Sequence, residues 1–285
     1  MNSLLIITVV LTLSLQNITK KEFNNKLFGK GTIAFSAAAT LVAAILFVIR
    51  LKIPFDYSPS VLAYSVMFGL GYGASTLFSI LAIYCGSLSF TSLITSYSLI
   101  VPTIYGLVFL KEKISTFLII GLALLVVSLF LINYVKEKEQ KQIKIKWIIY
   151  VVISFLGNGL CTTVQKVQII DFNGKYKNEF MTVALLLVAV SLFIVSFFKE
   201  KKEITKSIKS GIVPIVICGL ANGISNIVVM ALSLRMSASV MFPLISAGSV
   251  VVTFFISVLW YKEKMTLTQK IGFALGVSSV VFLNL

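Results

Sequence analysis

Histidine is absent from this sequence of 285 residues, and only ten residues are acidic. All ten lie in polar stretches or at the ends of apolar ones: Glu22, Asp56, Glu112, Glu137, Glu139, Asp171, Glu179, Glu200, Glu203 and Glu263. Without histidine ligands or paired aspartates, neither a metalloprotease nor a Mg²⁺-dependent transferase of the membrane is expected. Proton-coupled carriers usually keep an ionisable acid or histidine inside the membrane. We therefore expect neither an enzyme nor proton coupling through an intramembrane carboxylate.

Charged residues of either sign are scarce, at 12% of the chain, where soluble domains carry about a quarter. Apolar residues make up 58%, and the mean hydropathy is +1.01. The net charge of +15 comes from lysines between apolar runs, a placement that favours a lipid bilayer as partner and not nucleic acid. The three cysteines, Cys85, Cys161 and Cys218, are far apart in apolar runs, so we expect no disulfide framework, metal or cofactor.

Apolar stretches long enough to cross a bilayer, each needing about 20 residues, follow one another along the chain. We place them at 2–19, 31–49, 60–84, 87–110, 114–134, 146–166, 180–198, 211–234, 238–261 and 267–285. The lysine-rich segment 134–146 is the longest polar connection and the expected hinge between two halves. The predicted fold class is an all-α integral membrane protein with ten transmembrane helices.

The two halves repeat each other. The stretch Phe109–Thr116 returns 151 positions later as Trp260–Leu267, and Gly69-x-x-x-Gly73 returns 150 positions later as Gly219-x-x-x-Gly223. Because five crossings is an odd number, the repeats 1–135 and 145–285 are predicted to be inverted, as in many transporters with a midplane site. The glycine pairs are expected to be helix-packing faces.

The repeated charged motif joins two apolar runs in each half, so it reads as the polar turn of a helical hairpin. Ser115 and Thr266 follow it and are predicted N-caps of the next helix. Five plus five crossings with Lys111-Glu-Lys-Ile-Ser115 and Lys262-Glu-Lys-Met-Thr266 at this turn resemble EamA-type members of the drug/metabolite transporter superfamily, whose usual motif is Gly-Glu-Arg-x-Thr. Pro102 and Pro243 depart from the family pattern, since they lie at different offsets from the glutamate.

The resemblance implies a transporter in the plasma membrane with both termini in the cytoplasm. Lysine and arginine, however, are more abundant on the side opposite to the termini, and this distribution favours external termini. We follow the family for the orientation.

Uncharged polar residues inside the predicted helices supply the candidate site. Amides are costly in hydrocarbon unless they meet partners or a cavity, whereas Ser and Thr more often join helices. The candidate substrate-binding residues are Asn17, Tyr72, Tyr97, Asn158, Asn222 and Asn226. Lys20 and Lys166 occupy similar places at the ends of the first and sixth predicted helices, and the resemblance implies contact with an anionic solute there; the alternative is that they reach the lipid interface.

These features predict a secondary transporter of a small organic metabolite, an exporter or a facilitator, that works by alternating access as a monomer or homodimer. The alternatives are an exchanger or importer of a nucleoside-, vitamin- or sugar-phosphate-like solute, and a lipid-facing flippase subunit. A polar cavity at the midplane favours the carrier, and a lateral groove open to lipid favours the flippase.

Overall fold

A computed structural model describes residues 2–27, 30–51, 57–85, 91, 94–133, 145–261 and 266–284; most of these residues are helical and none of them lies in a strand. The helices are α1 Asn2–Leu27, α2 Thr32–Ile49, α3 Pro59–Cys85, α5 Ile100–Val108, α6 Thr116–Asn133, α7 Ile145–Asp171, α8 Lys177–Lys199, α9 Ile204–Ser233, α10 Ala238–Tyr261 and α11 Leu267–Asn284, with a 3-10 turn η1 at Tyr97–Leu99. An all-helical fold is therefore confirmed for the described part of the chain.

Six of these helices (α1, α2, α3, α7, α8 and α9) are long and apolar enough to cross a membrane. Four shorter apolar helical stretches lie at Ile94–Val108, Thr116–Ile132, Ala238–Ser249 and Leu267–Leu283. The start of the predicted helix 87–110 and the second copy of the charged motif, 262–265, lie outside the described residues.

Several helix boundaries differ from the predicted ones. The first helix continues to Leu27 where 19 was expected, the sixth continues to Asp171, and the eighth begins at Ile204. The added residues are largely polar, including Lys20 and Lys21. Hydropathy marks the part of a helix that lies in hydrocarbon, whereas the backbone hydrogen bonds continue past that limit into the headgroup region.

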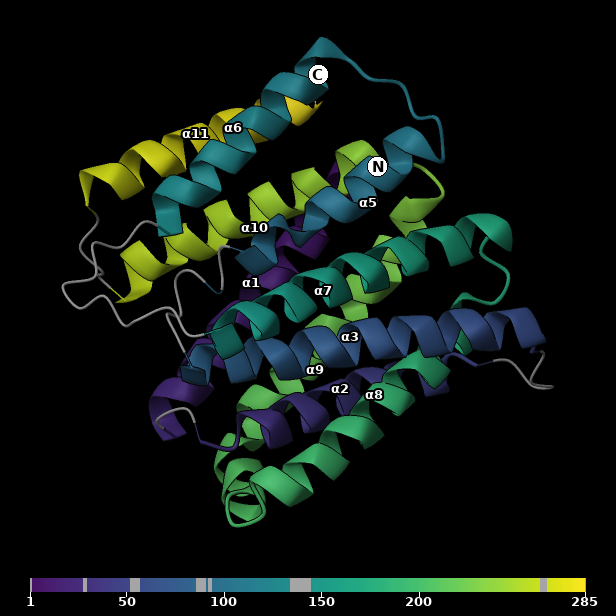
Figure 1. Cartoon of the computed structure of the whole chain (residues 1–285), viewed down its shortest axis with the longest axis vertical. Helices are drawn as coiled ribbons and strands as arrows, with labels where there is room; N and C mark the ends of the chain where they lie inside the picture. Colours follow the sequence, from purple (N-terminus) through teal and green to yellow (C-terminus); the bar gives the residue numbers. More distant parts are fainter. Residues whose placement is uncertain are drawn as a thin grey trace.

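The helices pack in an order that pairs one half of the chain with the other (Figure 1). In the centre, α1 packs against α9 and α10, and α7 packs against α3 and α5. At one edge α2 packs against α8; α2 also contacts α9, and α8 also contacts α3. At the opposite edge α6 packs against α11. Most of these contacts join residues before and after the 134–144 segment, so the two halves form one interleaved bundle.

The α6–α11 contact contains a reciprocal pair of hydrogen bonds. Ser128 Oγ donates to the Gly272 carbonyl at 2.7 Å, and Ser279 Oγ donates to the Gly121 carbonyl at 2.8 Å. Ser279 follows Ser128 by 151 positions, and Gly272 follows Gly121 by the same number. A Cβ on Gly272 would lie 2.8 Å from the Leu131 Cβ, and one on Gly121 would lie 2.8 Å from the Leu283 Cγ, so the two glycines let the helices approach closely enough for these bonds.

A close backbone crossing joins α3 and α7. A Cβ built on Gly71 would lie 2.8 Å from the Gly157 carbonyl oxygen, and one built on Gly157 would lie 2.6 Å from the Gly71 oxygen. No real side chain accepts such distances, so only glycine allows these helices to meet this closely. Because α3 and α7 belong to different halves, this crossing fixes the halves against each other.

Two predicted helix caps are confirmed. Ser115 Oγ accepts a hydrogen bond from the Leu118 amide at 3.0 Å, ahead of α6. Thr266 and Gln269 form a capping box ahead of α11, because the hydroxyl accepts from the Gln269 amide and the Gln269 side chain accepts from the Thr266 amide. The charged motif is therefore followed in the sequence by a capped helix in both halves.

Glutamates from distant turns cap two further helices. Glu200, just after α8, accepts from the amides of Ile33 and Ala34 in the first turn of α2, both at 3.1 Å. Glu112 accepts from the amides of Ala238 and Ser239 in the first turn of α10, at 2.6 and 2.8 Å. A carboxylate at a helix N-terminus satisfies free amides and meets the positive end of the helix dipole.

Candidate functional site

A polar cavity of about 430 Å³ lies between five helices of both halves. Such a volume falls within the roughly 300–1,000 Å³ typical of small-molecule sites. The lining comes from α1, α2, α3, α7 and α9 together with a residue ahead of η1: Gln16, Asn17, Lys20, Asn24, Thr32, Phe35, Ser36, Ala39, Thr40, Tyr72, Ser75, Thr76, Ser79, Ile80, Ile83, Thr95, Asn158, Cys218 and Asn222.

The cavity occupies one half of the depth of the bundle. The lining residues of α1 all lie in its C-terminal half, those of α2 in its N-terminal half, and those of α3 from its middle to its C-terminal end. Lys20 and Asn24 are exposed at the end where α1 finishes and α2 begins. The cavity therefore reaches the surface at that end and stops near the middle of the bundle.

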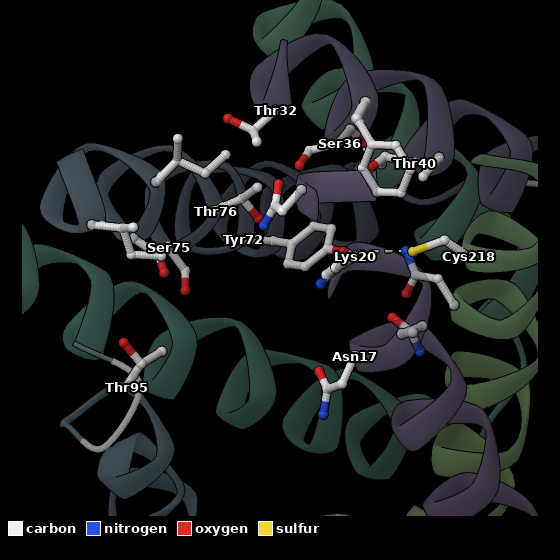
Figure 2. A pocket seen from close by; sticks show the side chains of 18 of the residues that line it. Asn17, Lys20, Thr32, Ser36, Thr40, Tyr72, Ser75, Thr76, Thr95 and Cys218 are labelled. Atoms are coloured by element: carbon white, nitrogen blue, oxygen red, sulfur yellow. Dashed lines mark hydrogen bonds between the residues drawn. The ribbon is translucent and has the colours of Figure 1, made fainter. Parts of the chain in front are cut away.

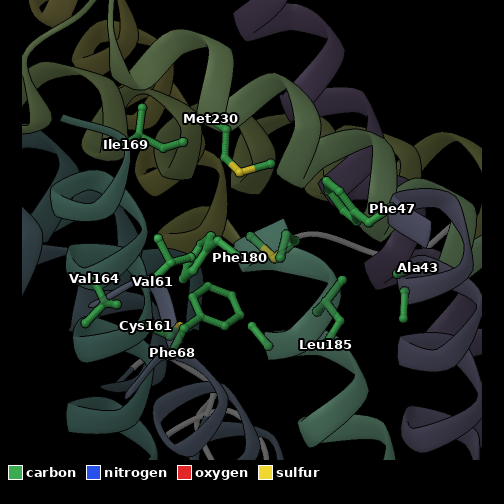
Figure 3. Packing of buried hydrophobic residues seen from close by; sticks show 13 residues of the cluster. Ala43, Phe47, Val61, Phe68, Cys161, Val164, Ile169, Phe180, Leu185 and Met230 are labelled. Carbon is green, nitrogen blue, oxygen red and sulfur yellow. The ribbon is translucent and has the colours of Figure 1, made fainter. Parts of the chain in front are cut away.

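An apolar cluster fills the opposite half of the depth (Figure 3). It comes from the other ends of the same helices, namely the C-terminal parts of α2, α7 and α9 and the N-terminal parts of α3 and α8. Phe47, Phe180 and Met230 are at most 2% exposed, and Phe68 and Phe180 meet edge to face with ring centroids 5.5 Å apart. We call this cluster the plug, since it separates the cavity from the far end.

Tyr72 lies where the cavity meets the plug, and a chain of hydrogen bonds holds it there. The Asn222 amide donates to the Tyr72 hydroxyl at 3.1 Å (Figure 2). Asn226 donates to the Asn222 side-chain oxygen at 2.9 Å, and Gln165 donates to the Asn226 oxygen at 3.1 Å. The network thus runs from α7 through α9 to α3 and orients the Asn222 amide toward the tyrosine.

Lys20 is the one cation among the described lining residues, and none of these residues is acidic. Figure 2 shows its side chain in the open space near Tyr72 and above Asn17. Among the described residues none forms a hydrogen bond or an ion pair with its ammonium group. The cavity consequently offers many uncharged hydrogen-bonding groups and a single positive charge.

The structure brings five of the eight predicted site residues together at this cavity: Asn17, Lys20, Tyr72, Asn158 and Asn222. Three lie outside its lining. Tyr97 donates its hydroxyl to the Val126 carbonyl, Asn226 supports Asn222 from behind, and Lys166 is buried at the far end of the bundle.

Sequence reasoning passed over the hydroxyl face of α2. Thr32, Ser36 and Thr40 line the cavity, and Figure 2 shows them on one side of the helix. They are spaced four residues apart in an otherwise apolar run, so they share one helix face. This four-residue spacing in the sequence is the feature that predicts a hydroxyl-bearing face on α2.

Three comparisons with known proteins bear on this geometry. No curated protein matches the sequence. One solved chain, described only as "Crystal structure of protein", superposes with a TM-score of 0.78 at 11% identity, covering 99% of this chain and 95% of the other. This likeness concerns the fold alone.

The model of the EamA-like transporter family matches residues 145–285. Members of this family are membrane transporters of small molecules, and the long apolar helices of the described part agree with a membrane location. The second half of the chain therefore belongs to the EamA-like transporter family of the drug/metabolite transporter superfamily, and the protein is a multi-pass membrane protein.

Proposed function

We propose that the protein is a secondary transporter, an exporter or facilitator, that moves a small polar organic metabolite across the plasma membrane by alternating access. The observation that carries this proposal is the division of the bundle into a polar cavity at one end and an apolar plug at the other. A transporter that works by alternating access has a cavity open at one end and closed at the other, because the solute reaches a midplane site from one side while the other side is sealed.

We further propose ten crossings arranged as inverted repeats, 1–135 and 145–285. The helix contacts support this, since exchanging each helix for its repeat partner turns the α1–α9 contact into α7–α3 and the α2–α9 contact into α8–α3. The reciprocal bonds of Ser128 and Ser279 support it at residue level. A pseudo-two-fold axis in the membrane plane relates repeats of this kind.

The second candidate, an exchanger or importer of an anionic solute, is favoured by Lys20. Its positive charge in a lining without described acids would attract a carboxylate or phosphate. In both cases the cavity binds the solute mainly through amide and hydroxyl groups, and the protein acts as a monomer or homodimer.

The first experiment identifies a solute. A metabolite library is screened by thermal shift with the purified protein in detergent, because a ligand at about 100 times its Kd stabilises the state that binds it by about 2.7 kcal/mol. Hits are then tested for counterflow in liposomes. A library that contains sugars, nucleosides, amino acids and their phosphates, and that gives neither a shift nor counterflow, would contradict the proposal.

The second experiment tests the site. Asn222→Leu is expected to leave the protein folded, while initial counterflow falls at least about tenfold because the Tyr72 hydroxyl loses its partner and the solute loses an amide. Tyr72→Phe is expected to act in the same direction more weakly. Asn226→Leu is the comparison variant: Asn226 lies behind the lining and supports the Asn222 side chain, so its loss should lower counterflow less than the loss of Asn222 does.

Melting temperature is measured for all three variants. If the residues only join helices, stability falls by about 0.6 kcal/mol per lost bond and counterflow does not change. Normal counterflow in Asn222→Leu and Tyr72→Phe would place the solute elsewhere in the bundle.

A further inference from the structure

Lys166 has an unusual place for a lysine, because its side chain is 3% exposed. Its Nζ donates to the carbonyls of Ser233 and Met236, at 2.5 and 2.6 Å. These carbonyls belong to the end of α9 and the turn that precedes α10. A buried ammonium group is costly unless its hydrogen bonds are satisfied, and here the turn between α9 and α10 satisfies it.

Glu112 holds the same turn from its other side. It accepts from the first amides of α10, Ala238 and Ser239, and its negative charge also acts on Lys166. A cation thus meets the carboxyl end of α9 and an anion meets the amino end of α10, the arrangement that both helix dipoles favour. Together the two side chains fix the α9–α10 turn at the sealed end of the bundle.

The first half of the chain contains a corresponding lysine and a corresponding helix end, but these two groups are not bonded to each other. Lys20 stands near the end of α1 as Lys166 stands near the end of α7, and Ile83 precedes Ser233 by 150 positions. Lys20 and Ile83 both line the cavity, and no described residue bonds to the Lys20 ammonium group. At the sealed end Lys166 is bonded to the α9–α10 turn. At the open end Lys20 and Ile83 both line the cavity and are not bonded.

We propose that Lys166 and Lys20 are alternate latches of the transport cycle. Lys166 bonds the α9–α10 turn and keeps its end sealed; when the cavity closes, Lys20 bonds the Ile83 carbonyl while Lys166 releases Ser233 and Met236. This inference rests on the proposed alternating access. Each lysine is then a positioning residue that sets which end is open, and the net number of bonded lysines stays constant through the exchange.

The test measures the accessibility of two reporter cysteines in a chain whose three native cysteines are replaced by alanine. Ser79→Cys reports on the cavity, and Thr182→Cys, at a position 4% exposed on the first part of α8, reports on the sealed end. A membrane-impermeant maleimide is applied to right-side-out and inside-out vesicles. In the reference chain, Ser79→Cys is expected to react from one side and Thr182→Cys to react slowly from both.

Lys166→Met removes two charge-assisted bonds with little change in side-chain length, so the populations shift toward the opposite state. We expect labelling of Ser79→Cys to slow at least about fivefold and Thr182→Cys to become reactive from the other side. Lys20→Met is expected to have the reverse effect, so that Ser79→Cys reacts faster than in the reference chain and Thr182→Cys reacts more slowly. The double variant should return both rates toward the reference.

Lys175→Met is the matched control, because Lys175 is exposed near the same end as Lys166 and donates to the neighbouring Tyr176 hydroxyl. It should change neither rate. If Lys166→Met does not fold, Lys20→Met still tests the proposal, because Lys20 is exposed and its replacement should not prevent folding. Unchanged or slower Ser79→Cys labelling in that variant would overturn the proposal.

Counterflow by the unmodified chain separates this proposal from the proposed function. If the unmodified chain shows counterflow but Lys166→Met leaves both labelling rates unchanged, the protein is a transporter without the proposed latch. A chain without counterflow in which the two variants shift labelling in opposite directions has the latch but not the function.

Discussion

Replacing Gly219 by alanine should destabilise the bundle, whereas the same change at its repeat partner Gly69 should not. A Cβ on Gly219 would lie 2.5 Å from both the Ala39 carbonyl oxygen and the Val42 Cβ of α2. A Cβ on Gly69 would lie 3.5 Å from the Ala184 oxygen of α8, which is ordinary contact. The two positions occupy equivalent places in the sequence repeat but differ in available space.

The magnitude follows from two opposing effects. Alanine favours a helix over glycine by up to about 1 kcal/mol, and this gain applies at both positions. At Gly219 the new methyl group must also push α2 away by about 1 Å, and overpacking of this kind costs about 1–3 kcal/mol. We therefore expect a net loss of about 1 kcal/mol for Gly219→Ala and no loss for Gly69→Ala.

The assay is unfolding of purified protein in a mild detergent, followed by melting temperature and by a denaturant series. The two variants are compared with each other as well as with the parent, because detergent effects common to both then cancel. Equal stability of Gly219→Ala and Gly69→Ala would refute the reasoning, since it would mean that α2 and α9 do not approach as closely as the structure places them.

Two further predictions concern protons. With no acid among the described lining residues, reconstituted protein should equilibrate its solute at equal pH on both sides; accumulation only with an imposed pH gradient, abolished by an uncoupler, would contradict this. Burial raises the pKa of Glu200 above that of an ordinary glutamate, despite the opposing bonds from Ala34 and Ile33. Its contribution to stability is therefore greatest at low pH and is lost as pH rises through the raised pKa. Glu200→Gln keeps an oxygen for both amides and removes the charge, so the melting temperature of the variant should rise relative to that of the parent as pH increases through the raised pKa of Glu200. A difference independent of pH would reject the desolvation argument.

Much of the fold could be predicted because the membrane imposes a simple rule on sequence. Helices in hydrocarbon must be long and apolar, and the apolar runs accordingly marked the helices of the described part. The caps at Ser115 and Thr266 were also predictable, since a cap is a local interaction between residues three apart. The ends of α1 and α7 were not, because charged residues such as Lys20 and Lys166 end a hydropathy signal without ending a helix.

The candidate site was predictable only in part, and the reason is the range of the interactions. Side-chain amides inside apolar runs, such as that of Asn222, can be recognised from the sequence as candidates because they need hydrogen-bond partners. Which partners they meet depends on helices far apart in sequence, so nothing local distinguished Asn222, which lines the cavity, from Asn226, which lies behind it. The bonds of Lys166 and Glu112 to the α9–α10 turn span 67 to 127 residues, and no spacing rule reaches that far.

The plug also determines where the membrane voltage acts. Water that enters the open cavity would carry the electrical potential of one compartment inward as far as Tyr72, so the voltage would fall mainly across the apolar half of the bundle and not over its full thickness. A unit charge that crosses 100 mV changes in energy by about 2.3 kcal/mol. Lys166 lies on α7 between Val164 and Ile169 of the plug, within the steepest part of this field. If Lys166 moves as proposed, its movement carries gating charge, and a membrane potential would bias the protein toward one of the two proposed states.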